Sequence, residues 1–185
     1  VVQKNEDQTI NFELDLKMIP GKYNGETKIK YKYYYSPVDL TEEQKFVYVD
    51  TIKGFKWEIT SADESKDYFE IHPPRSYSLH KMELTPFPKL HIPAMKDQEY
   101  SSIFKIGPGW GEYSFSTIFW RYKITDVINF DDSSYIAKIQ AASYWGKEVN
   151  DNIICTADFE FNSKLGFTKM FYSFTDRTNI EILKK

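Results

Sequence analysis

The chain has 185 residues, the length of one domain that can bury its own core. Its 24 basic and 27 acidic residues leave a formal net charge of −3, and its arginines are few. A nucleic-acid partner is disfavoured, because polyanion recognition uses a basic surface rich in arginine. The chain's three arginines are Arg75, Arg121 and Arg177. The apolar runs are also shorter than the ~20 residues that a membrane-spanning helix needs.

Residues 1–8 are polar and are similar to the flexible tether that follows a processed leader or lipid anchor, although a frayed terminus looks the same. We therefore expect a tether over 1–8 and a single domain over 9–185. Cys155 is the one cysteine, which excludes an intrachain disulfide. Its alternation with Ala157 and Phe159 indicates a small buried side chain and not a nucleophile.

Two-residue alternation of apolar and polar residues dominates the first third of the chain and predicts strands. Ile10–Met18 and Thr27–Tyr35 alternate around turn residues and indicate a hairpin. Thr41 and Gln44 have the spacing of a capping box, which predicts one short helical turn near Thr41–Phe46, the only helix start that we find. Further strands are predicted at Phe46–Ile52, Phe55–Ile59 and Tyr68–His72, with a polar loop over 61–65.

Six of the eight prolines lie between His72 and Pro108, so this segment is predicted to be edge strand or irregular. Long strands then return without helical connectors. Their predicted ranges are Tyr100–Ile106, Tyr113–Ile128, Tyr135–Trp145, Ile153–Phe161, Phe167–Phe174 and Asn179–Leu183.

The fold class that follows is all-β, a single curled antiparallel sheet that forms an open barrel or a two-layer sandwich. Ten or more strands in meander order exceed what one flat sheet tolerates. Several strands are apolar on both faces, which requires cover on both sides. Around Tyr113–Tyr122 one face carries Tyr113, Phe115 and Phe119 and the other carries Ile118, Trp120 and Tyr122.

The three histidines all fall in the proline-rich segment, but their spacing lacks the tight pairing typical of zinc ligands, so no metal or cofactor is predicted. His72-Pro73-Pro74-Arg75 has a fixed backbone that could aim His72 and Arg75 at a ligand, or leave Arg75 paired with an acid such as Asp67. An enzyme hypothesis places a hydrolase or isomerase site at His72, Arg75 and His80.

The glycine-rich run Gly107–Gly111 lacks the Lys-Ser/Thr of a nucleotide loop and predicts a sharp bend that presents Trp110 at the end of the sheet. Aromatic residues near it could line the hollow of a curled sheet and receive an apolar or sugar-like ligand. The candidate ligand-binding residues are Trp110, Tyr113, Phe115, Phe119 and Trp120, with Arg75 and His72 beside them.

Gly109–Gly111, Ala157–Asn162 and Leu165–Tyr172 resemble the strand-turn-strand ending of extracytoplasmic domains of Bacteroidetes lipoproteins. This resemblance implies a curved β-sheet in the cell envelope, similar to lipocalin-like and lipoprotein-carrier folds. It implies no defined activity, so no site residue is carried over from it.

We therefore expect a non-catalytic envelope domain that holds an apolar or glycan ligand in the hollow of its sheet. The enzyme hypothesis above is one alternative, and a structural assembly module that forms a homodimer is another. The expected location is the periplasm or outer-membrane surface, with membrane contact only through a removed N-terminal lipid anchor.

Overall fold

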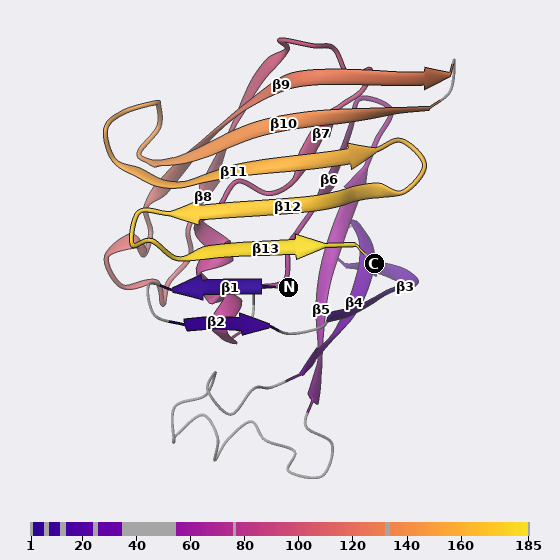
Figure 1. Cartoon of the computed structure of the whole chain (residues 1–185). Helices are drawn as coiled ribbons and strands as arrows, with labels where there is room; N and C mark the ends of the chain where they lie inside the picture. Colours follow the sequence, from indigo (N-terminus) through magenta and orange to yellow (C-terminus); the bar gives the residue numbers. More distant parts are fainter. Residues whose placement is uncertain are drawn as a thin grey trace.

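The chain forms two antiparallel sheets in a computed structural model that describes residues 2–5, 8–11, 14–23, 26–34, 55–75, 77–131 and 134–184 (Figure 1). The predicted all-β class is confirmed, and the described strands form two sheets and not a closed barrel. The helical turn predicted at Thr41–Phe46 and the strand at Phe46–Ile52 lie outside the described residues.

In the described part of the chain, sheet A has eight strands in the order β2-β1-β13-β12-β11-β10-β9-β8. From β9 to β13 each strand pairs with the preceding one, as the meander prediction required. The bounds are β8 (Glu99–Lys105), β9 (Thr117–Asp131), β10 (Ser134–Trp145), β11 (Ile153–Asn162), β12 (Gly166–Phe174) and β13 (Asn179–Leu183).

The sheet continues past β13 with two short strands from the start of the chain. β1 (Val2–Asn5) pairs with β13, and β2 (Gln8–Asn11) pairs with β1. These strands occupy part of the range for which the sequence predicts a tether, and the boundary at residue 8 stays a prediction.

Sheet B has five strands within the described ranges, in the order β3-β4-β5-β6-β7. The predicted hairpin is present as the β3–β4 pair, although its first strand was predicted to start at Ile10, which lies in β2 of sheet A. The polar loop expected over 61–65 is instead mostly strand, because Ala62–Glu64 pair with Phe69–Ile71 of β6. The bounds are β3 (Leu14–Tyr23), β4 (Glu26–Tyr34), β5 (Phe55–Glu64), β6 (Tyr68–Ile71) and β7 (Lys89–His91).

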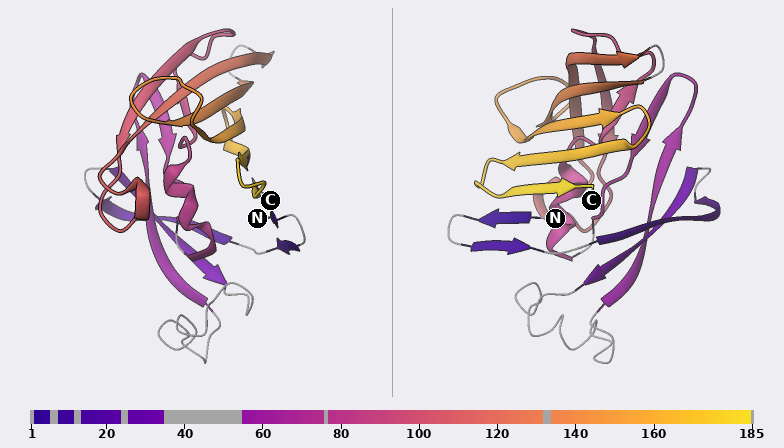
Figure 2. Two further views of the ribbon diagram at one scale, coloured as in Figure 1. Left: turned by 90° about the vertical axis from the view of Figure 1, so that its left-hand side faces the viewer. Right: turned by 45° about the vertical axis from the view of Figure 1, so that its right-hand side comes forward.

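The proline-rich segment holds a 3-10 helix, η1 (Tyr77–Leu84), that the sequence did not predict. A 3-10 helix repeats every three residues, so Leu79 and Met82 fall on one face, and both are completely buried. Figure 2 shows this magenta helix between the two sheets. Among the described residues, no helix has the length and apolar character needed to cross a bilayer.

The hollow of sheet A is occupied by the chain itself. Phe87 is 1% exposed and packs its ring 4.6 Å from that of Trp120 in β9, between ring centroids. Phe69 in β6 reaches the other side of the hollow, where its ring lies 6.0 Å from that of Phe167 in β12. Leu90 of β7 and the η1 side chains belong to the same core cluster. The space in which the sequence suggested a ligand is therefore part of the hydrophobic core.

Candidate functional site

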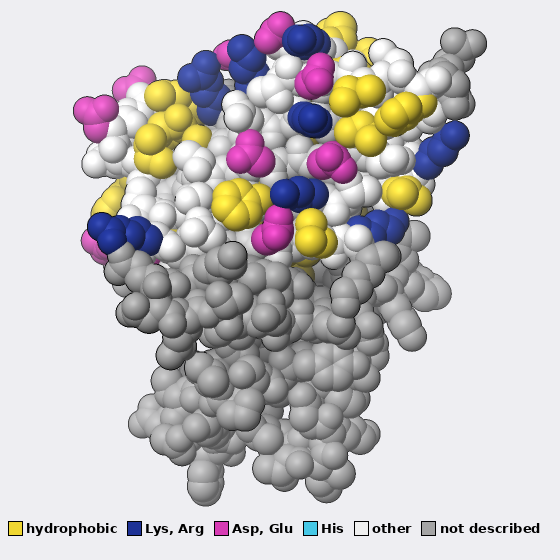
Figure 3. All heavy atoms as spheres, viewed as in Figure 1, with side chains coloured by type: hydrophobic (Ala, Val, Ile, Leu, Met, Phe, Trp, Pro, Cys, Tyr) yellow, Lys and Arg dark blue, Asp and Glu magenta, His cyan; other side chains and the backbone are white. Residues whose placement is uncertain are grey.

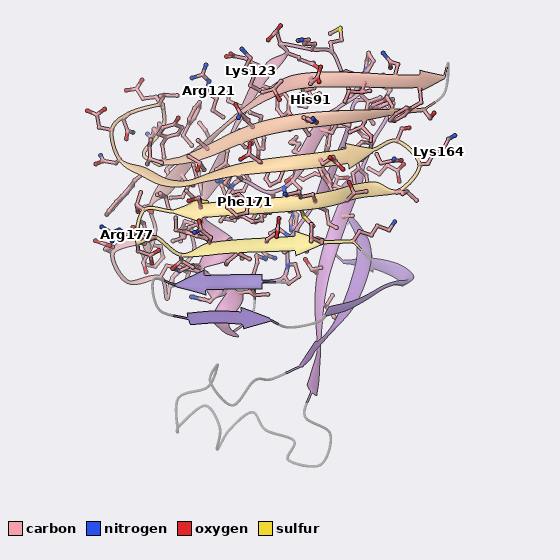
Figure 4. The ribbon with its side chains drawn as sticks, in the orientation of Figure 1. His91, Arg121, Lys123, Lys164, Phe171 and Arg177 are labelled. Carbon is pink, nitrogen blue, oxygen red and sulfur yellow. The ribbon has the colours of Figure 1, made fainter. Side chains whose placement is uncertain are left out.

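Aromatic side chains gather at the end of the molecule where the β8–β9, β10–β11 and β12–β13 connections meet. Alternate connections of an antiparallel meander fall at the same end of its strands, and Arg177 in the β12–β13 turn marks this end in Figure 4. The rings of His80 and Trp110 stack in parallel, 3.7 Å between centroids and 1° between planes. The rings of Tyr113 and Trp145 are 4.8 Å apart. We call these four residues the aromatic rim.

The backbone of the glycine-rich run holds Trp110 in place, as the sequence predicted. Gly109 and Gly111 take φ values of 90° and 57°, which non-glycine residues rarely adopt. The Trp110 amide donates to the Ser114 hydroxyl at 2.8 Å, and the Tyr113 amide donates to the Trp110 carbonyl at 3.1 Å. A short 3-10 helix, η2 (Gly111–Tyr113), therefore fixes the two aromatic residues relative to each other.

Charged groups surround the rim. Lys81, next to His80, donates to the Asp176 carboxylate at 2.6 Å and to the Thr178 hydroxyl at 3.0 Å. Desolvation by burial raises the pKa of Tyr113, and the nearby carboxylates of Glu112 and Asp176 raise it further. The rim thus combines aromatic faces with carboxylates and an ammonium group.

Burial also changes the titration of His80. Desolvation lowers its pKa below the ordinary value, against an opposing attraction from the Glu83 carboxylate. The neutral imidazole is therefore favoured in the ring stack, where it lies flat on the Trp110 indole.

The five predicted aromatic ligand residues do not come together in one cavity. Trp110 and Tyr113 lie at the rim, whereas Phe115 is 80% exposed with a φ of 59°. The strand predicted to start at Tyr113 begins only at Thr117 because this bend precedes it. Phe119 and Trp120 are adjacent in β9 and point to opposite faces: Trp120 is 3% exposed in the core, while Phe119 lies opposite the exposed Ile103 of β8.

The three residues of the enzyme hypothesis have separate partners. The His72 Nδ1 lies 3.3 Å from the Ser61 hydroxyl, and its ring packs against Phe87. Arg75 donates to Glu83 at 2.5 Å, so its acid is Glu83 and not Asp67. His80 stacks on Trp110.

A second polar cluster lies where β6 and β7 of sheet B face the inner side of sheet A. Lys89 donates to Glu70 at 2.6 Å, with both side chains largely buried, and its ammonium lies 4.3 Å from the Tyr68 ring centroid. The Tyr100 hydroxyl donates to the Lys89 carbonyl at 2.6 Å. These contacts satisfy the polar groups that β7 brings into the interior. Among the described residues no group of three or more His, Cys, Asp or Glu is placed to hold a metal ion.

Sequence reasoning left two of the four rim residues, His80 and Trp145, out of the candidate ligand-binding set, although it named His80 for the alternative enzyme site. Trp145 ends β10 just before Gly146, whose φ of 124° marks a turn, so the meander order could have placed it beside the Trp110 loop. No comparable signal placed His80 beside Trp110, because η1 was not predicted. Comparison with known proteins finds no family model, no curated protein and no solved structure that matches this chain.

Proposed function

We propose that the chain is a binding domain that holds a glycan at the aromatic rim. The observation that carries this proposal is the parallel stack of His80 on Trp110 next to the Tyr113–Trp145 pair. Such a stack covers one face of the indole and fixes its orientation, so a ligand meets a preformed surface. Preformed surfaces bind with less loss of side-chain freedom.

The chemistry around the rings supports a sugar over a purely apolar ligand. A pyranose has a face of C–H groups that can lie on an aromatic ring and an edge of hydroxyl groups that needs donors and acceptors. Carboxylates of Glu112 and Asp176 lie near Tyr113, and Lys81 is bound to Asp176. A flat hydrocarbon has no donor or acceptor that could hydrogen-bond to these charged groups.

The proposal places the ligand at the rim and not in the hollow of sheet A, where Phe87 and Leu90 are buried. An extracytoplasmic location fits this function, because cell-envelope glycans are found there. Its support is the resemblance to envelope domains carried by Gly109–Gly111, Ala157–Asn162 and Leu165–Tyr172.

A glycan array followed by calorimetry on the best-bound oligosaccharide tests this proposal. We expect Trp110→Ala to weaken binding at least about tenfold, because a lost ring contact costs on the order of 1.4 kcal/mol. Phe130→Ala is the matched control, since Phe130 is a 62% exposed aromatic residue at the opposite end of β9. No binding on the array, or equal affinity of the wild type and Trp110→Ala, would refute the proposal.

A further inference from the structure

The β8 strand is an edge of sheet A with a regular alternation. It is the last strand in the order of the sheet, and among the described strands it pairs only with β9. The Ile106 amide donates to Ser116, and the Ile124 amide donates to Gln98. Even-numbered residues of β8 therefore direct their backbone groups to β9, and odd-numbered residues direct theirs to the free edge.

The odd-numbered residues also carry exposed side chains. Glu99, Ser101, Ile103 and Lys105 are all exposed, and Ile103 is 57% exposed. Glu99 at one end shares its carboxylate with Arg121 and Lys123 of β9. Lys105 at the other end has no carboxylate within ion-pair distance in the described part of the chain. An acid at one end and a base at the other make this edge self-complementary.

We infer that β8 pairs antiparallel with β8 of a second copy of this chain, with Ser102 on the two-fold axis. In this register Glu99 lies opposite Lys105 of the other copy, and Ser101 lies opposite Ile103. Both are pairs of odd-numbered residues, so their backbone groups meet as hydrogen-bonded pairs. Registers shifted by two residues lose both Glu99–Lys105 pairs and shorten the ladder.

Packing supports the same register. The two Ile103 side chains become diagonal neighbours across the new pair, about 7–8 Å apart, which is within reach of each other. On the outer face of sheet A, Ile103 lies beside Phe119 of β9, and Phe119 in turn lies opposite Tyr144 of β10. Pairing at the edge would extend this apolar row into the second copy.

The outer face of sheet A itself fits an edge contact better than a face-to-face contact. Figure 3 shows charged side chains of both signs spread over this face, between separate groups of hydrophobic ones. Ion pairs such as Lys169–Glu181 join neighbouring strands there, and Phe171 lies alone at its centre (Figure 4). Stacking two such faces would bury these charges.

Disulfide trapping of Ser102→Cys tests the register. Residues opposite each other in a non-hydrogen-bonded pair have Cα atoms about 4.5 Å apart, within the range that a disulfide spans. The native Cys155 is completely buried and does not compete. We expect oxidised dimers from Ser102→Cys and none from Gln140→Cys, an exposed position of β10.

Sedimentation velocity gives a second measurement. It uses variants of exposed residues and so does not depend on changing the half-buried Ser102. Lys105→Glu sets like charges opposite each other and is expected to raise the dimer dissociation constant about tenfold. Lys147→Glu makes the same charge change in the exposed β10–β11 loop and should leave dimerisation unchanged. A monomeric wild type at its highest soluble concentration, or a dimer that Lys105→Glu does not weaken, would overturn the inference.

Discussion

Phe87→Ala removes the side chain that fills the hollow of sheet A between the two sheets. The Phe87 ring is 1% exposed and has three aromatic neighbours: Trp120 at 4.6 Å, His72 at 4.7 Å and Phe104 at 5.5 Å between centroids. The Arg75 guanidinium lies 5.3 Å from the ring centroid. Truncation therefore opens a cavity whose walls belong to separate elements that cannot close together.

The expected loss in free energy of unfolding is about 4 kcal/mol. A buried Phe→Ala change costs about 3–5 kcal/mol, and the cation–π contact of Arg75 adds about 0.5–1 kcal/mol. For a domain of this size the midpoint of thermal unfolding should fall by about 8–16 °C.

Urea unfolding followed by circular dichroism measures the change directly. Phe130→Ala, the same substitution at a 62% exposed position, should stay within about 0.5 kcal/mol of the wild type. A Phe87→Ala loss below about 1 kcal/mol would show that the hollow is not held by this ring.

Three further predictions concern Phe115, Cys155 and the pair of histidines His80 and His91. Phe115→Gly should raise the free energy of unfolding by about 0.5–1 kcal/mol, measured by urea unfolding, because Phe115 has a φ of 59° and is 80% exposed. Cys155, whose thiol pKa is raised by burial, should react with a thiol reagent only at the rate of unfolding, and fast labelling of the native protein would contradict this. Desolvation lowers the pKa of His80 and of His91, so the unfolded chain binds these protons first and stability should fall as the pH drops below about 6.5. Urea unfolding at about pH 7.5 and about pH 5.5 should show a smaller difference in His80→Gln/His91→Gln than in the wild type.

The strands of the meander could be predicted closely from the sequence, because period-two alternation reports directly on a buried face. Asn179–Leu183 agrees with β13 at both ends, and Ile153–Phe161 ends one residue before β11 does. The η1 helix could not be predicted in this way. The prolines on either side of it suggested an edge strand or irregular structure. Its burial depends on the space between the two sheets, which the local sequence does not report.

The candidate site could be predicted only in part, for a geometric reason. The Gly107–Gly111 run identified Trp110 from local backbone chemistry. Its stacking partner His80 lies 30 positions earlier in the chain, and contacts of this kind depend on how the sheets pack. Phe119 and Trp120 show the converse: adjacent aromatic residues in a strand suggest one site, although the pleat sends them to opposite faces.

The pairing of β1 with β13 has a kinetic consequence. Each strand from β9 to β13 pairs with the strand that precedes it, so the meander of sheet A can grow by closing short loops. Gln3 lies opposite Ile180, and this contact closes a loop of almost the whole chain at a higher cost in entropy. The β1–β2 pair is therefore expected to join sheet A late, after the meander has formed and η1 has been enclosed.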